Sequence, residues 1–295
     1  MKILVYFVCG LFLIGLLNAC GGSSGGSSSS PEDLVDDRPY ELRVPSSYDV
    51  NTPTPLIVVL HGFTGDGAGI LSYFRLAGAA ERHGFLVAYP DGSLDSMGRR
   101  HWNGTDACCA FTFVQTDDVA YLSALIDDVE ANYNVDPRQI FVIGYSNGGY
   151  MSHRMACDRS NRVAAIVSLA GASWNDPNQC QTQDPVSVLQ VHGDLDGTVL
   201  FDGGFSGGVP YPSAIDTVSD WADRNGCTGT LVDSGMNINL DQTIAGDESR
   251  VQRFTNCPAS GEVELWTILG GDHGPDFDDS WPDFFWAFLS SHPKP

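Results

Sequence analysis

The chain has 295 residues, and its 37 Asp and Glu against 15 Lys and Arg give a formal net charge of −22 at pH 7. A charge this negative argues against nucleic acid as a partner and against electrostatic adhesion to anionic lipid, because both need clustered basic side chains. From residue 31 onward the chain is long enough for one large core, with no second linker and no internal repeat. We therefore expect a single folded domain over residues 37–295, acting as a monomer.

The first twenty residues have the layout of an export signal. Lys2 precedes an apolar run over residues 3–17, and the four residues that end at Cys20, LNAC, resemble a bacterial lipobox. We expect residues 1–19 to be a lipoprotein signal peptide and Cys20 to receive the lipid; the alternative is an uncleaved transmembrane anchor. Residues 20–36 continue as a Gly/Ser-rich tether. The protein would then be exported, to the bacterial outer membrane, the periplasm or the exterior, and would contact the membrane only through its lipid.

The cysteines outside this segment are even in number, which predicts disulfides in an exported protein. No C-x-x-C or C-x-x-H spacing supports zinc, and we expect no metal site. The sequence alone leaves many pairings open. The pairing we favour joins Cys227 to Cys257 and connects the adjacent Cys108 and Cys109 to Cys157 and Cys180.

Short apolar runs of strand length alternate with segments of helix length along the rest of the chain. The helix prediction rests mainly on residues 119–133, where apolar side chains recur at i, i+3 and i+4 and Thr116 or Asp117 is placed to cap the N-terminus. Strands are expected at residues 40–44, 56–60, 85–89, 140–143, 163–169, 186–191 and 263–269, and helices also after residue 146 and at 213–225 and 277–289. This alternation predicts an α/β fold with a mostly parallel central sheet and helices on both faces.

The five residues Gly144–Gly148 read GYSNG and lie between an expected strand and an expected helix. A G-x-S-x-G sequence in this context resembles the nucleophile elbow of α/β-hydrolases. On such a turn the serine has a strained backbone and an exposed hydroxyl, and the following helix directs its positive end at the same place. We therefore predict Ser146 as a nucleophile.

Two later loops supply partners for this serine. Residues 191–199 (VHGDLDGTV) follow a strand, and the H-G-x-x-D-x-x-V pattern favours Asp196 over Asp194 as the carboxylate of a triad. The D-x-D-G fragment also hints at calcium, but the rest of an EF-hand loop is missing. Residues 270–274 (GGDHG) follow the last strand, and they predict His273 as the general base. The order Ser146, Asp196, His273 is the hydrolase order.

Together these motifs resemble the polyhydroxybutyrate depolymerase and feruloyl-esterase-like family of secreted α/β-hydrolases. The matching segments are residues 60–63 (LHGF), 102–109 (WNGTDACC), 118–129, 145–157 (YSNGGYMSHRMAC) and the loops of the proposed acid and base. The resemblance implies the α/β-hydrolase fold and hydrolysis of small or oligomeric carboxyl esters, of hydroxyalkanoates or of feruloyl or acetyl type, without a cofactor.

The resemblance also assigns roles around the serine. The backbone N–H groups of Phe63 and Asn147 are expected to form the oxyanion hole, and His61 is expected to hold the loop that carries Phe63. The aromatic candidates for the substrate pocket are Trp102, Tyr145 and Trp281, with Trp174 as a further possibility.

Two rival classes remain open at the level of sequence. A peptidase can use the same three side chains, because a triad does not by itself choose between esters and amides. A non-catalytic, lipid-anchored binding protein on a hydrolase scaffold is the second rival, and the intact triad argues against it.

Overall fold

The computed structural model describes residues 30–109 and 116–295. The predicted signal peptide, the lipidation site Cys20 and most of the tether lie outside the described residues. In the part of the chain that is described, none of the helices combines the length and the hydropathy needed to cross a bilayer.

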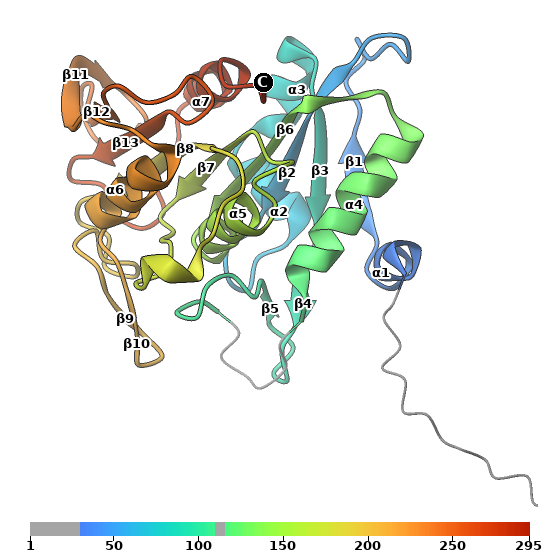
Figure 1. Cartoon of the computed structure of the whole chain (residues 1–295), viewed down its shortest axis with the longest axis horizontal. Helices are drawn as coiled ribbons and strands as arrows, with labels where there is room; N and C mark the ends of the chain where they lie inside the picture. Colours follow the sequence, from blue (N-terminus) through green and yellow to red (C-terminus); the bar gives the residue numbers. More distant parts are fainter. Residues whose placement is uncertain (1–29, 110–115) are drawn as a thin grey trace, which may run out of the picture.

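A twisted sheet of nine strands forms the centre of the molecule, in the order β1-β3-β2-β6-β7-β8-β13-β12-β11 (Figure 1). The bounds are β1 Tyr40–Arg43, β2 Thr54–Leu60, β3 Leu86–Pro90, β6 Val135–Tyr145, β7 Ala165–Leu169, β8 Ser187–Gly193, β11 Leu231–Ile238, β12 Ser249–Phe254 and β13 Val263–Ile268. The six strands from β3 to β13 pair in parallel, and β1, β12 and β11 add antiparallel edges. The predicted α/β-hydrolase fold with a mostly parallel sheet is confirmed.

Helices cover both faces of this sheet. The helix bounds are α1 Pro31–Asp37, α2 Gly67–Tyr73, α3 Leu76–His83, α4 Asp118–Asn132, α5 Asn147–Asp158, α6 Ala214–Asn225 and α7 Trp281–Ser290, with a 3₁₀ turn at Pro177–Gln179. Along β2, Val58 and Leu60 pack with α4, α5 and α6, whereas Ile57 and Val59 pack with α2, α3 and α7. Because successive strand side chains point to opposite faces, one continuous apolar run supplies both cores.

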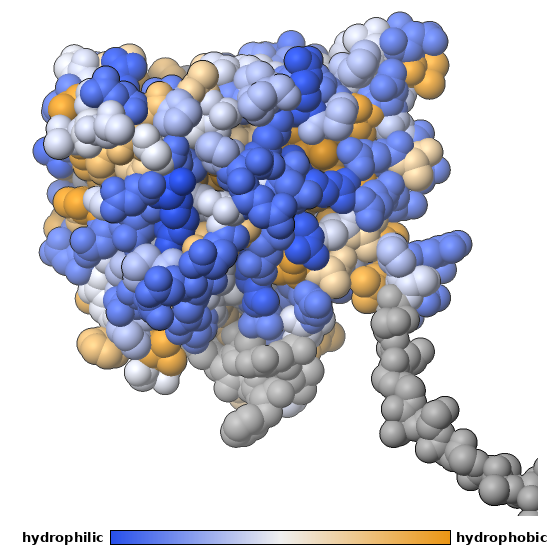
Figure 2. All heavy atoms as spheres, viewed as in Figure 1, coloured by the Kyte–Doolittle hydropathy of each residue, from blue (hydrophilic) through white to orange (hydrophobic). Residues whose placement is uncertain are grey.

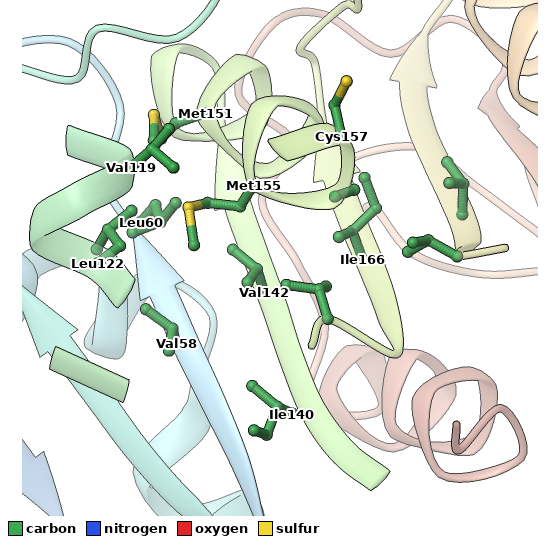
Figure 3. Packing of buried hydrophobic residues seen from close by; sticks show 14 of the residues in the cluster. Val58, Leu60, Val119, Leu122, Ile140, Val142, Met151, Met155, Cys157 and Ile166 are labelled. Atoms are coloured by element: carbon green, nitrogen blue, oxygen red, sulfur yellow. The ribbon is translucent and has the colours of Figure 1, made fainter. Parts of the chain in front are cut away.

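The core beneath α5 is tightly filled. Met151 and Met155 of α5 reach toward Leu60 and α4, as Figure 3 shows. On the outside, hydrophilic side chains cover most of the face drawn in Figure 2, as the acidic composition requires. Two short hairpins project at the same edge of the molecule, β4 Ser93–Leu94 with β5 Arg100–His101 and β9 Gly204–Ser206 with β10 Val209–Tyr211 (Figure 1).

Three expectations need correction. Residues 31–36, assigned to the tether, belong to helix α1, because Ser30 caps it and accepts a hydrogen bond from Asp33 N. The last helix begins at Trp281 and not at residue 277, since Phe277 forms a β-bridge with Asp241. The antiparallel strands β11 and β12 were not expected, because much of β11 is exposed and lacks an apolar run.

The disulfide prediction is partly confirmed. Cys227 and Cys257 are paired as expected. Cys157 pairs with Cys180 and Cys108 pairs with its neighbour Cys109, so the expected links from Cys108 and Cys109 to Cys157 and Cys180 are wrong. The fold explains the change: Cys157 at the end of α5 and Cys180 after the 3₁₀ turn bring their Cα atoms to 5.4 Å, a normal bridging separation.

Candidate active site

Ser146 lies on the sharp turn between β6 and α5, with φ 52° and ψ −117°. A positive φ is costly for a residue with a side chain, and such strain persists only where the surrounding structure enforces it. Here the Ser146 N–H donates to Leu169 O over 2.7 Å, which ties the turn to β7. A Cβ on Gly148 would collide with the carbonyl oxygen of Leu60, so only glycine lets the turn lie this close to β2.

His273 and Asp196 complete a hydrogen-bonded row with this serine. His273 Nε2 is 3.0 Å from Ser146 Oγ, and His273 Nδ1 is 2.7 Å from Asp196 Oδ2. The His273 side chain is 18% exposed and that of Asp196 is fully buried. The structure thus brings together, in one row, three residues that the sequence places on three different loops.

Four donors surround the Asp196 carboxylate. Thr198 N and Val199 N donate to Oδ1 over 2.8 and 2.9 Å, while His273 Nδ1 and His192 Nε2 lie 2.7 and 3.2 Å from Oδ2. Burial by itself raises the pKa of the Asp196 carboxyl, but the hydrogen bonds from His192 and His273 outweigh burial and hold this pKa below its ordinary value. Asp196 is therefore an anion at neutral pH, as the orienting member of a triad must be.

Asp194, the rejected candidate for the acid, has a different contact. Its Oδ1 accepts a hydrogen bond from Gly270 N over 2.6 Å, and Leu195 N donates to Gly271 O over 2.9 Å. The loop that carries Asp196 is thus bonded directly to the loop that carries His273. Gly193 permits this contact, because a Cβ there would collide with the carbonyl oxygen of Gly271.

The two predicted oxyanion residues lie on the loop after β2 and at the start of α5. Asn147 is the first residue of α5 and is fully buried, and its side chain pairs with the backbone of Trp102: Oδ1 accepts from Trp102 N over 2.7 Å and Nδ2 donates to Trp102 O over 2.8 Å. Phe63 lies on the loop after β2. Two backbone hydrogen bonds hold this loop in place: Thr64 N donates to Arg100 O, and Gly65 N donates to Gly62 O. Both residues are therefore held by their surroundings in fixed positions.

His61 stabilises that same loop. Its Nδ1–H donates to Gly62 O over 2.7 Å, and its Nε2 accepts from Gly92 N over 2.8 Å. Burial lowers the pKa of His61, which matches a neutral ring with one donor and one acceptor nitrogen. The expected structural role of His61 agrees with these contacts.

A cleft of about 280 Å³ lies between this loop and helix α2. Tyr145 lines it, and the Tyr145 ring lies 5.2 Å from the His273 ring. Trp102 and Trp281 do not line it: they are 0% and 1% exposed and pack in the two cores, so their assignment to the pocket is wrong. Sequence cannot distinguish a core tryptophan from a pocket tryptophan, because both lie in apolar surroundings.

A small apolar cluster on the α5 side of the serine was missed from the sequence. It gathers Ala107, Cys108, Cys109, Tyr150, Ala172, Val199 and Tyr211, with Phe63 and Val209 packed against it. Asn147 Nδ2 lies 3.6 Å from Cys108 Sγ, which places the Cys108–Cys109 pair directly beside the elbow. The WNGTDACC segment therefore forms one wall of the site. Within the described ranges, no group of three or more His, Cys, Asp or Glu side chains is placed to hold a metal ion.

The wound parallel sheet and the Ser–His–Asp row at its edge define an α/β hydrolase. A protein-family model described as "alpha/beta hydrolase fold" matches residues 55–211. Probable feruloyl esterase C of Aspergillus oryzae is 30% identical over 234 residues, which cover 75% of this chain and 76% of that protein. The chain therefore belongs to the α/β-hydrolase family, among its feruloyl-esterase-like members.

Two further similarities agree with this assignment. Feruloyl esterase B of Piromyces equi is 29% identical over 240 residues, 79% of this chain and only 42% of the longer relative. Among solved structures, the acetyl xylan esterase from Aspergillus awamori superposes with a TM-score of 0.59 at 18% identity, covering 85% of this chain and 93% of that chain. The last similarity concerns the fold alone.

Proposed function

We propose that this protein is a serine carboxylesterase that hydrolyses feruloyl or acetyl esters of small or oligomeric sugars. The observation that carries the proposal is the row from Ser146 Oγ through His273 to Asp196, with donor–acceptor separations of 3.0 and 2.7 Å. These distances fall in the range in which a general base withdraws a hydroxyl proton. The names of the relatives supply the ester class.

The chemistry follows from this geometry. His273 Nε2 accepts the proton of Ser146 as Oγ attacks the ester carbonyl carbon, and the Asp196 carboxylate holds the resulting imidazolium through Nδ1–H. We assign the backbone N–H groups of Phe63 and Asn147 to the negative oxygen of the tetrahedral intermediate. The imidazolium then protonates the leaving alcohol, an acyl-enzyme remains on Ser146, and water repeats both steps to release the acid.

A panel of esters tests the proposal. Purified protein is offered p-nitrophenyl acetate, methyl ferulate, acetylated xylan oligomers and hydroxybutyrate oligomers, each with wild type and Ser146→Ala. We expect turnover that falls by roughly 10⁴- to 10⁶-fold in Ser146→Ala while its melting temperature is unchanged. Absence of turnover on every ester, or activity that survives in Ser146→Ala, would refute the proposal.

The same panel separates an esterase from a peptidase. A matched pair, feruloyl methyl ester and the corresponding feruloyl amide, differs only in the leaving group. An esterase hydrolyses the ester and leaves the amide intact, whereas a peptidase on the same triad cleaves both.

We also propose that residues 1–19 direct export and that Cys20 carries a lipid. Three disulfides among the described residues support this, since such bonds persist in oxidising compartments. Membrane fractionation and intact mass of the wild type and of Cys20→Ser decide the question. The wild type should be membrane-bound with an acylated N-terminus, and Cys20→Ser should be unacylated. If the two proteins differ in mass only by the Cys-to-Ser substitution, lipidation is refuted.

A further inference from the structure

A chain of buried hydrogen bonds runs from helix α6 to the triad acid. It consists of Trp221 on α6, His153 on α5, and Gln190 and His192 on β8, and each of these residues is at most 1% exposed. Trp221 Nε1 is 3.0 Å from His153 Nδ1, His153 Nε2 is 3.0 Å from Gln190 Oε1, and Gln190 Nε2 is 3.2 Å from His192 Nδ1. His192 Nε2 then lies 2.8 Å from Val199 O and 3.2 Å from Asp196 Oδ2.

The hydrogen-bond partners determine which ring nitrogen is protonated in each of the two histidines, His153 and His192. An indole N–H can only donate, so His153 Nδ1 must accept and its Nε2 must carry the proton that Gln190 Oε1 receives. The amide of Gln190 is oriented independently, because its Nε2 also donates to Gly171 O over 2.8 Å. His192 Nδ1 therefore accepts from Gln190, and the remaining proton of the His192 ring lies on Nε2, directed at Asp196 and Val199.

The hydrogen-bond chain ends at two residues of the acid loop, Asp196 and Val199. Val199 accepts from His192 through its carbonyl oxygen and donates through its N–H to Asp196 Oδ1, over 2.8 and 2.9 Å. Asp196 Oδ2 is shared between His192 and His273. A hydrogen bond from an uncharged N–H to Oδ2 leaves the carboxylate ionised and fixes the orientation of its plane. Both the charge and the orientation are needed to hold the tautomer of the catalytic histidine.

We infer that His192 is a positioning residue for catalysis, and that the buried chain from Trp221 sets its tautomer so that Nε2–H supports Asp196. The inference rests on the proposed esterase function. It assigns a role to a histidine that contacts the triad acid and that the sequence marks only as the first residue of the H-G-x-x-D-x-x-V pattern.

Burial keeps the His153 ring of this hydrogen-bond chain neutral. Burial lowers the pKa of His153 to about 4, so this ring stays uncharged at neutral pH. Burial, with a smaller contribution from the negative charge of Asp196, also raises the pKa of the Tyr145 and Tyr150 phenols, so both stay neutral. Hydrogen-bond geometry therefore sets the tautomer of His153 at neutral pH.

Three variants test the inference kinetically. His192→Phe keeps the ring and removes the donor, and we expect kcat to fall about 10- to 100-fold, the effect of one hydrogen bond to a charged group, with KM changed less than about threefold. His192→Gln places an amide N–H near the position of Nε2, and we expect it to restore kcat to within about threefold of wild type. Val218→Ala, in the same core on α6, controls for destabilisation: its melting temperature should fall while kcat is unchanged.

Nitrogen-15 NMR of the imidazole rings reads the tautomers directly and needs no turnover. Both His153 and His192 should be protonated on Nε2 alone, and Trp221→Phe should leave His153 as a mixture of tautomers. Protonation of His192 on Nδ1, or a His192→Phe enzyme with kcat within twofold of wild type, would overturn the inference. An inactive wild-type enzyme whose His192 is protonated on Nε2 would refute the esterase proposal but would support the hydrogen-bond chain.

Discussion

Replacing Asn147 by Ala tests how the residue after the nucleophile is held. The Asn147 side chain is fully buried and makes two hydrogen bonds to the Trp102 backbone, of 2.7 and 2.8 Å. Without it, the Trp102 N–H is stranded in the core, at a cost of about 1–3 kcal/mol, while Trp102 O keeps only a 3.3 Å bond from Cys109 N. Adding about 1 kcal/mol for the lost bond to that oxygen, the free energy of unfolding should fall by about 2–4 kcal/mol.

Catalysis should fall as well, because the wall formed by the WNGTDACC segment is no longer fixed to the elbow. A displacement of about 1 Å at a reacting group costs on the order of 100-fold in rate, so we expect kcat to drop about 10- to 100-fold. Urea unfolding gives the free energy, and turnover of p-nitrophenyl acetate gives kcat.

Asn225 offers a matched control elsewhere in the fold. This residue at the end of α6 is 3% exposed, and its side chain brackets the backbone of Val186 in the same way, accepting from Val186 N over 3.2 Å and donating to Val186 O over 2.7 Å. Asn225→Ala should therefore lose comparable stability and keep its kcat. A loss below about 1 kcal/mol in Asn147→Ala, or equal kcat in the two variants, would refute the reasoning.

Three further substitutions have expected outcomes. Arg38→Ala removes the charged partner of the buried Asp118 at 2.7 Å and leaves the carboxylate, within the described residues, only its bond from Asn103 N, so the free energy of unfolding in urea should fall by about 3 kcal/mol; a loss under about 1 kcal/mol would contradict this. Gly148→Ala inserts a Cβ into a carbonyl oxygen of β2, so we expect little folded or active protein by circular dichroism and turnover, whereas wild-type yield and rate would disprove the steric argument. Burial alone lowers the pKa of His292, but its hydrogen bonds with Glu262 and Phe288 O and the nearby charges of Glu262 and Glu264 together raise it, while the bond with His292 lowers the pKa of Glu262. The pair therefore stabilises the fold most between about pH 4.5 and 6.5, the ordinary pKa values of Glu and His; this stabilisation is lost as pH rises through the raised pKa of His292 or falls through the lowered pKa of Glu262. The difference in melting temperature between wild type and Glu262→Gln should be largest in that window. A difference that does not depend on pH would contradict the reasoning.

The central strands could be predicted because they are buried on both faces and contain apolar runs, as in residues 56–60 of β2 and 140–143 of β6. The serine, acid and histidine could be predicted because each follows such a strand in a short motif. By contrast, β11 has only one buried residue, Ile238, so its strand character comes from pairing with β12 and leaves little pattern in the sequence. The disulfide pairing could not be predicted, and neither could the burial of Trp102 and Trp281 in the two cores. Both depend on which elements pack together in the fold, and this cannot be read from the local sequence.

The hydrogen bonds that align the triad also lie beyond local sequence, and they follow from strand pairing. Parallel β8 and β13 stay in register up to the pair Gly193 and Ile268, immediately before the loops of the acid and the base. Asp194 N then donates to Ile268 O over 3.1 Å, which continues the same ladder into the loops. Because the ladder extends this far, the separation of Asp196 from His273 is set by sheet geometry and not by two independent loops. A perturbation that slips this register would therefore move Asp196 away from His273.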